Sequence, residues 1–248
     1  MNPNMSEFHS GVVAPVECLK EGWALIKNQY WLFLGISLVG MLIGSAVPII
    51  LIGPMMCGIF LCLFSKMRNE KVEFAALFKG FDYFVQGLIV AAIKAIPMII
   101  VIVPSYLIMF AVMATTMPRN HPTPDETSVF MASFFGFELL FVAVIIIVGI
   151  VVEIFFIFAF PLIVDRNLSG LEAIKLGIKA SKANFGGVLG LLLLNAALGV
   201  AGVLCCFVGV YFVLPVTFAA HAVAYRRVFP ERFQSFPPPP PPPASWAT

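Results

Sequence analysis

Two long apolar runs constrain what this chain can fold into. One covers residues 31–52 (WLFLGISLVGMLIGSAVPIILI), and the other covers residues 139–164 and contains a single charged residue, Glu153. A helix needs about 20 apolar residues to cross the hydrocarbon core of a bilayer, and both runs are longer. Since 60% of the chain is hydrophobic, against roughly 45–50% in soluble domains, a soluble domain could not bury this surface. The sequence predicts an all-α, multi-pass integral membrane protein.

Apolar length, proline and glycine divide the chain into six predicted membrane segments. A break at Pro48 to Pro54 separates the first two, and residues 202–209 join the last two without a polar loop. An N-terminal segment (1–14) and a tail (231–248) flank a membrane domain of residues 15–230. The six segments are 31–52, 53–66, 84–113, 128–163, 186–204 and 206–225.

The basic residues give the chain a predicted orientation. Of the 15 Lys and Arg, all except Lys94 and Arg119 lie before the first segment, after the sixth, or in the second and fourth connections. With six spans these regions share one side of the membrane, and an excess of Lys and Arg marks the cytoplasmic side. We therefore expect both termini of this cell-membrane protein to be cytoplasmic.

Residues 169–185 predict an amphipathic helix at the membrane surface. Ser169 and Glu172 have the spacing of a capping box, so a helix is expected to begin there. Apolar and charged residues recur on opposite faces at helical spacing, which is typical of a helix in the headgroup plane with its lysines toward water and phosphates. The apolar face is Leu171, Ile174, Ile178 and Phe185, and the charged face is Glu172, Lys175, Lys179 and Lys182.

A similar pattern near the N-terminus suggests a parallel internal repeat. Residues 16–35 align without gaps to residues 171–190, which pairs glutamates, glycines and lysines, with Lys20 and Lys27 among the matched basic residues. The predicted units are about 15–68 and 170–229, and such repeats are common in membrane folds. Chance similarity between two amphipathic helices is the alternative. Residues 72–84 (VEFAALFKGFDYF) form a third amphipathic piece.

Polar residues inside the spans are the candidate functional residues: Lys94, Glu138, Glu153, Asn195 and His221. Such groups are costly in hydrocarbon and normally face a partner, the bundle interior or water. Lys94 and Glu153 each lie about 15 Å from the cytoplasmic ends of their segments at 1.5 Å per residue, so we expect them to pair. The pair could be structural or part of a proton or ion path, and Lys94 could instead extend toward the interface. Asn195 suits a hydrogen bond between helices.

No motif in the sequence indicates catalysis, a metal, a cofactor or nucleic acid. The five cysteines lack metal-ligand spacing, and the signatures of common hydrolases and nucleotide-binding sites are missing. Seven prolines, Pro237 to Pro243, would form a polyproline II rod of about 22 Å. We expect a disordered spacer there, and binding to an aromatic groove is the alternative.

Two stretches carry a resemblance to a known group of proteins. They are FPLIVDRNLSGLEAIKLGIKASKANF (160–185) and LFKGFDYF (77–84), each followed by apolar spans. Together they resemble uncharacterised bacterial polytopic membrane proteins related to the membrane domain of some glycerophosphodiester phosphodiesterases. The resemblance covers most of residues 15–230 and implies a six-helix bundle in a bacterial inner membrane. The phosphodiesterase domain is absent, so the resemblance implies no catalytic activity.

These observations leave three hypotheses for function. The first is a non-enzymatic protein that interacts with membrane lipids or serves as an accessory or scaffold subunit of a larger membrane complex, because amphipathic helices are present and catalytic motifs are not. The alternative is a transporter or channel for a small solute or proton, suggested by Lys94, Glu138 and Glu153. A membrane enzyme acting on lipid is the third, and the sequence shows no acid, base and nucleophile set for it.

Overall fold

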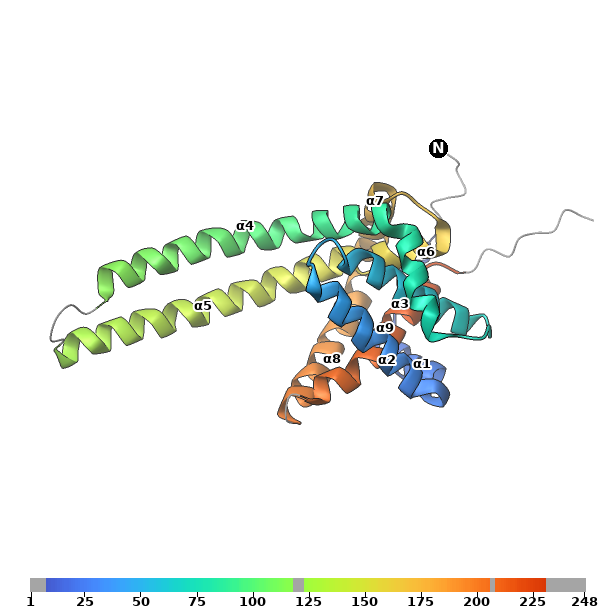
Figure 1. The fold of residues 1–248 in the computed structure, drawn as a ribbon, viewed down its shortest axis with the longest axis horizontal. Helices are drawn as coiled ribbons and strands as arrows, with labels where there is room; N and C mark the ends of the chain where they lie inside the picture. The colour runs from blue at the N-terminus through green and yellow to red at the C-terminus, as the bar shows by residue number, and fades with distance from the viewer. Residues whose placement is uncertain (1–7, 118–122, 206–207, 231–248) are drawn as a thin grey trace, which may run out of the picture.

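The computed structural model describes residues 8–117, 123–205 and 208–230. These ranges are helical, with short connections and no strand. Figure 1 shows the elements, of which the two labelled η are 3-10 helices. In chain order they are α1 (Pro15–Ile26), η2 (Lys27–Gln29), α2 (Tyr30–Ala46), α3 (Ile52–Met67), η3 (Phe74–Tyr83), α4 (Phe84–Thr116), α5 (Pro124–Phe156), α6 (Ala159–Arg166), α7 (Gly170–Ala183), α8 (Phe185–Leu204) and α9 (Val208–Val228).

Five helical stretches in the described ranges are long and apolar enough to cross a membrane. The predicted second span is α3, which has 16 residues and is therefore about 24 Å long, less than the ~30 Å of a hydrocarbon core. The prediction of an all-α fold is thus confirmed for the described residues, the five apolar stretches are consistent with a membrane protein, and the sixth span stays a prediction. The five stretches are Pro15–Ala46, Phe74–Thr116, Pro124–Arg166, Phe185–Leu204 and Val208–Val228.

Two of the predicted segments are interrupted in the structure. The first predicted segment ran to residue 52, but α2 ends at Ala46 and a turn containing Ile49 at a positive φ of 72° precedes α3. Pro54 lies in the first turn of α3, where its missing N–H has no helical partner to lose. The fourth predicted segment (128–163) is divided, because α5 ends at Phe156 and α6 begins at Ala159.

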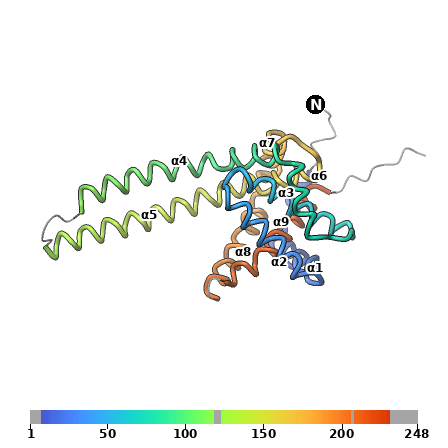
Figure 2. The backbone as a smooth tube through the Cα atoms, viewed as in Figure 1, coloured from blue at the N-terminus to red at the C-terminus, as the bar shows by residue number. Residues whose placement is uncertain are grey.

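Three helical hairpins build the fold: α2 with α3, α4 with α5, and α8 with α9. A short amphipathic element precedes each hairpin and packs on the second arm of another. α1 contacts α9, η3 contacts α3, and α7 contacts α5 and α6, so the contacts close a ring. Figure 2 shows that the α4–α5 hairpin projects far from the other helices, while the bases of all three hairpins meet.

Glycines allow the amphipathic elements to approach the hairpins closely. A Cβ on Gly22 in α1 would lie 2.7 Å from the backbone nitrogen of Ala220 in α9. Gly80 in η3 meets the backbone of Gly58 in α3 in the same way. Small residues are the usual means of close helix packing in membranes. Gly177 in α7, which the sequence aligned with Gly22, is packed less tightly, because a Cβ there would lie 3.6 Å from the backbone nitrogen of Ala159 at the start of α6, an ordinary contact distance.

Aromatic side chains fill the core where α3, α9 and the start of α6 meet. Ring centroids lie 5.3 Å apart for Phe64 and Tyr225, and 5.8 Å apart for Phe158 and Phe229. The Arg226 guanidinium lies 4.5 Å from the Phe64 ring centroid, within the range of a cation–π contact. The core of the described region is therefore packed and apolar at the base of the hairpins.

Residues 8–14 pack onto the helices. The backbone N–H of His9 donates to the carbonyl of Val228 at 2.9 Å. Asn184 accepts from the N–H of Val12 at 3.1 Å and donates to the carbonyl of His9 at 2.9 Å. The predicted disordered tail, residues 231–248, lies outside the described residues.

Candidate functional site

The predicted capping box at the start of α7 is confirmed. The N–H of Glu172 donates to the Ser169 hydroxyl oxygen at 3.4 Å, and the Glu172 carboxylate accepts from the N–H and the hydroxyl of Ser169 at 3.2 Å and 2.7 Å. These hydrogen bonds lower the pKa of Glu172, with the bond from the hydroxyl as the largest cause. Because Ser169 adopts an extended conformation at the N-cap, α7 begins at Gly170.

The predicted apolar face of α7 is only partly buried. Ile174 is buried, whereas Leu171 is 53% exposed and Phe185 is 48% exposed. The face that contacts α4, α5 and α6 is made of small residues, Ala173, Gly177, Ala180 and Ser181 together with Ile174. Hydrophobicity predicted that the larger side chains form the buried face, but close packing of one helix on another favours small residues there. α7 therefore docks on the protein through Ile174 and these small residues and leaves Leu171 exposed at the surface.

The predicted surface lysines are all exposed: Lys20, Lys27, Lys175, Lys179 and Lys182. Large aromatic side chains are exposed beside them on the N-terminal elements. Trp31 at the start of α2 is 74% exposed, and Trp23 in α1 is 47% exposed. Tryptophan and lysine together are typical of the membrane–water interface, and the N-terminal elements expose both.

The predicted pair of Lys94 and Glu153 is present. Lys94 Nζ in α4 lies 2.5 Å from Glu153 Oε2 in α5, which is an ion pair and a charge-assisted hydrogen bond. Lys94 is ten residues from the start of α4, and Glu153 is three residues from the end of α5. The side chains keep 29% and 35% of their surface exposed, so protein covers most of the pair and leaves one edge open.

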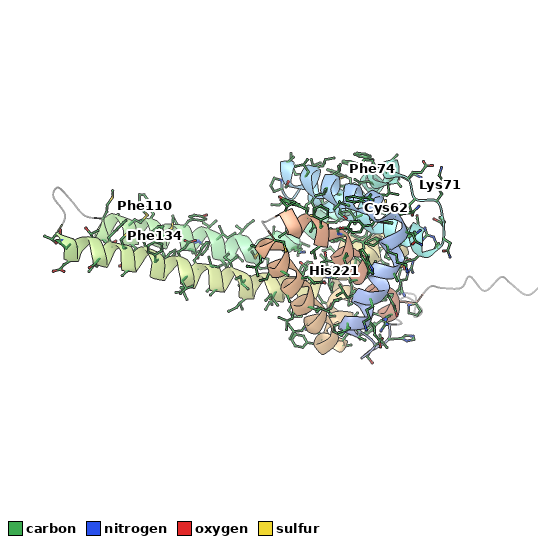
Figure 3. The ribbon with its side chains drawn as sticks, turned by 90° about the horizontal axis from the view of Figure 1, so that it is seen from below. Cys62, Lys71, Phe74, Phe110, Phe134 and His221 are labelled. Atoms are coloured by element: carbon green, nitrogen blue, oxygen red, sulfur yellow. The ribbon has the colours of Figure 1, made fainter. Side chains whose placement is uncertain are left out.

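Asn195 and His221 form a second polar pair next to the first. Asn195 Nδ2 in α8 lies 3.0 Å from His221 Nε2 in α9, and the charges of Glu153 and Lys94 act on His221. Asn195 Oδ1 is buried and has no hydrogen-bond partner among the described residues. Figure 3 labels His221 among the helices at the base of the α4–α5 hairpin. We call Lys94, Glu153, Asn195 and His221 the polar cluster.

The polar cluster lies where two hairpins meet inside the predicted membrane domain. Lys94 and Glu153 come from α4 and α5, whereas Asn195 and His221 come from α8 and α9, and α5 contacts α8. The pair of opposite charges is neutral as a unit, so its chemistry suits helix attachment or the transfer of a proton or ion. The described residues contain no group of three or more His, Cys, Asp or Glu side chains that could hold a metal ion.

Glu138 is the predicted residue that lies apart. It is 15 residues before Glu153 on the same helix, about 22 Å along the helix axis. It lines a pocket between α4 and α5 with Ser105 and several aromatic residues. The structure thus brings four of the five predicted intramembrane residues together and places the fifth in a separate pocket.

A charged cluster at the hairpin bases was not expected from the sequence. Arg226 in α9 pairs with Asp165 in α6 at 2.8 Å, and the Tyr225 hydroxyl donates to the same carboxylate at 2.7 Å. Arg227 pairs with Glu17 and Glu21 of α1 at 2.9 Å and 2.7 Å. In the sequence these basic residues indicated only orientation, because their acidic partners are distant along the chain.

Comparison with protein-family models, curated proteins and solved structures finds no match to this chain.

Proposed function

We propose that this chain is a non-enzymatic membrane protein that interacts with lipids or serves as an accessory or scaffold subunit of a membrane complex. The observation that carries the proposal is the set of three amphipathic elements, α1, η3 and α7, which form the bases of three apolar hairpins. Each element buries one face against protein and exposes lysines or large aromatic residues. That composition suits contact with headgroups and with neighbouring proteins at the interface.

The membrane topology that accompanies this proposal has six spans and cytoplasmic termini. α3 would be the sixth span, with the bilayer thinned locally around a short helix. The last turn of α3 carries Lys66, and the last turn of α9 carries Arg226 and Arg227. Because an excess of Lys and Arg marks the cytoplasmic side, these residues and the lysines of α1 and α7 would all be cytoplasmic.

The order of elements supports the proposed internal repeat. A short helix, an apolar helix, a break and a second apolar helix occur in α1–α3 and again in α7–α9. η3, α4 and α5 follow the same order with longer arms, which suggests a third unit. We retain the resemblance to the membrane domain of glycerophosphodiester phosphodiesterases as part of this proposal.

Tryptophan fluorescence tests the lipid part of the proposal. The chain has 3 tryptophans, so in a Trp246→Phe background the signal comes from Trp23 and Trp31. The protein is placed in vesicles that contain brominated phosphatidylglycerol or brominated phosphatidylcholine at equal fractions. A basic residue near an anionic surface contributes about 1 kcal/mol, so we expect the anionic lipid to quench more strongly.

The matched variants locate that preference on the exposed lysines. Replacing both Lys20 and Lys27 by Gln should remove the difference between the two lipids, whereas Lys71→Gln, in the exposed connection before η3, should keep it. Equal quenching by both lipids in the wild type would reject the lipid preference. Native mass spectrometry of the gently extracted protein then separates the two roles, because a stoichiometric protein companion identifies a subunit and a retained lipid identifies lipid handling.

Transport of a small solute or proton is the second candidate, and the polar cluster is what favours it. Its charged edge is partly open and lies within predicted spans. Proteoliposomes with a pH dye inside provide the test. Proton flux that depends on Glu153 would support transport, and a wild-type signal equal to that of empty liposomes would reject proton transport.

A further inference from the structure

A pocket lies between α4 and α5 in the half of the hairpin that is distant from the polar cluster. It has a volume of about 420 Å³. α4 supplies Ser105, Tyr106 and Met109, and α5 supplies Phe134, Phe137, Glu138 and Phe141. Figure 3 labels Phe134 on this hairpin, far from His221. The lining is thus mainly apolar and aromatic, with one carboxyl group and the hydroxyls of a serine and a tyrosine.

The aromatic rings of this pocket pack on one another in a fixed arrangement. The ring centroids of Tyr106 and Phe141 lie 5.9 Å apart at an interplanar angle of 62°. Those of Phe137 and Phe141 lie 6.2 Å apart and nearly parallel, at 9°. The electron-rich faces of aromatic rings attract cations, and this attraction is stronger where water is excluded.

Glu138 has no hydrogen bond or ion pair with any other residue that the structure describes. α5 has three other acidic residues. Asp125 and Glu126 lie in its first turn, at the end of the hairpin, and Glu153 is paired with Lys94. A carboxylate among apolar side chains is costly unless it is neutralised by a proton or a cation. The pocket therefore combines an uncompensated negative group with aromatic walls.

We propose that this pocket binds a hydrophobic organic cation, such as a quaternary ammonium or phosphonium ion, with Glu138 as the counter-ion. A small inorganic cation does not fit the lining, because Ca²⁺ and Mg²⁺ require six or more oxygen ligands and the pocket offers mainly carbon. Tyr106 lies 22 residues from the start of α4, about 33 Å along the helix. The site is therefore near the outer interface, where a cation can reach it from outside.

Equilibrium dialysis with radiolabelled tetraphenylphosphonium tests the proposal on the full-length protein in a detergent without choline groups. Uptake by protein-free micelles is subtracted. We expect saturable binding of one cation per chain, with at least a tenfold weaker affinity for Glu138→Gln. Asp125→Asn is the matched control, because it removes a carboxylate from the same helix outside the pocket, and its affinity should stay within twofold of the wild type.

Tetraphenylborate has nearly the same size and apolar surface as tetraphenylphosphonium but the opposite charge. It should show no saturable binding to the wild type. Equal binding of the two ions, unchanged affinity in Glu138→Gln, or the absence of saturable cation binding to the wild type would each overturn the proposal.

A second variant and a competition complete the design. Phe141→Leu keeps the carboxylate and removes an aromatic wall, so it should weaken binding of the cation about fivefold. If Glu138→Gln fails to elute as a folded species, unchanged affinity in Phe141→Leu would overturn the proposal. Displacement of the label by free choline would identify a soluble ligand, whereas displacement only by short-chain phosphatidylcholine would identify a lipid headgroup. The test is independent of the lipid preference at α1, so either result can fail without the other.

Discussion

The ion pair between Lys94 and Glu153 gives the sharpest prediction for stability. If the pair attaches α4 to α5, replacing either residue by leucine leaves an uncompensated charge in a largely apolar environment. Replacing both removes the two charges together. We therefore expect each single variant to be destabilised more than the double variant, which is the opposite of additive behaviour.

The geometry sets the size of the effect. At 2.5 Å and an effective dielectric constant of about 20, the Coulomb attraction is about 7 kcal/mol, and desolvation of the two ions offsets most of it. Removing one partner of a fully buried pair costs roughly 3–5 kcal/mol. Since the side chains of Lys94 and Glu153 are 29% and 35% exposed, we expect about 2 kcal/mol for each single variant and under about 1 kcal/mol for the double, a coupling of about 3 kcal/mol.

The coupling can be measured by unfolding the reconstituted protein with sodium dodecyl sulfate. Near-ultraviolet circular dichroism follows the tertiary packing of the wild type, Lys94→Leu, Glu153→Leu and the double variant. The control cycle combines Glu138→Leu with Lys94→Leu, because Glu138 lies on the same helix as Glu153 and does not contact Lys94. The losses of stability caused by these two substitutions should add. A double Lys94→Leu and Glu153→Leu variant that loses as much stability as the two single losses together would refute the pair.

Two further predictions concern α1 and α7. Gly22→Val should lower the free energy of unfolding by about 3 kcal/mol in a thermal unfolding experiment, because its Cβ would lie 2.7 Å from the backbone of Ala220 and overpack the contact. Gly186→Ala is the control and should leave the stability almost unchanged, since nothing lies within 4 Å of a Cβ there. Ser169→Ala should cost about 1 kcal/mol and raise the rate of hydrogen exchange in the first turn of α7. The lowered pKa of Glu172 means that the bonds accepted by its carboxylate contribute fully above the ordinary pKa of glutamate and are lost as the pH falls through the folded value. The difference in exchange between the wild type and Ser169→Ala should therefore shrink in acid to the part that comes from the Glu172 N–H donating to the Ser169 hydroxyl oxygen.

Local patterns in the sequence predicted the features that depend on neighbouring residues. The capping box of α7 follows from Ser169 and Glu172 alone, and the membrane class follows from apolar length. The pairing of Lys94 with Glu153 also followed, because two residues at equal depth in adjacent antiparallel helices must lie close together. In each case one helix, or one pair of consecutive helices, contains all the information needed.

Contacts between distant parts of the chain were not predicted. The pair of Asp165 and Arg226, and the packing of α1 on α9 through Gly22, depend on how three hairpins are arranged, which no local pattern encodes. The apolar face of α7 was misjudged for the same reason, since its neighbour α6 requires small residues rather than large ones. The end of the first segment was placed at residue 52 because the apolar run continues to that point, whereas the turn with Ile49 at positive φ follows α2, which ends at Ala46.

The location of the polar cluster explains why a long hairpin can project from the fold and still remain attached to it. Beyond the cluster, α4 and α5 contact mainly each other, so lipid would surround their apolar side chains without cost. At the cluster the situation reverses, because separating α5 from α8 would expose the Lys94–Glu153 pair and the amide of Asn195 to hydrocarbon. Charged residues at a bilayer centre cost several kcal/mol when they lack protein or water contacts. The polar cluster therefore adds a contribution at one depth to the contacts of α4 with α3 and of both helices with α7, which also hold the base of the hairpin.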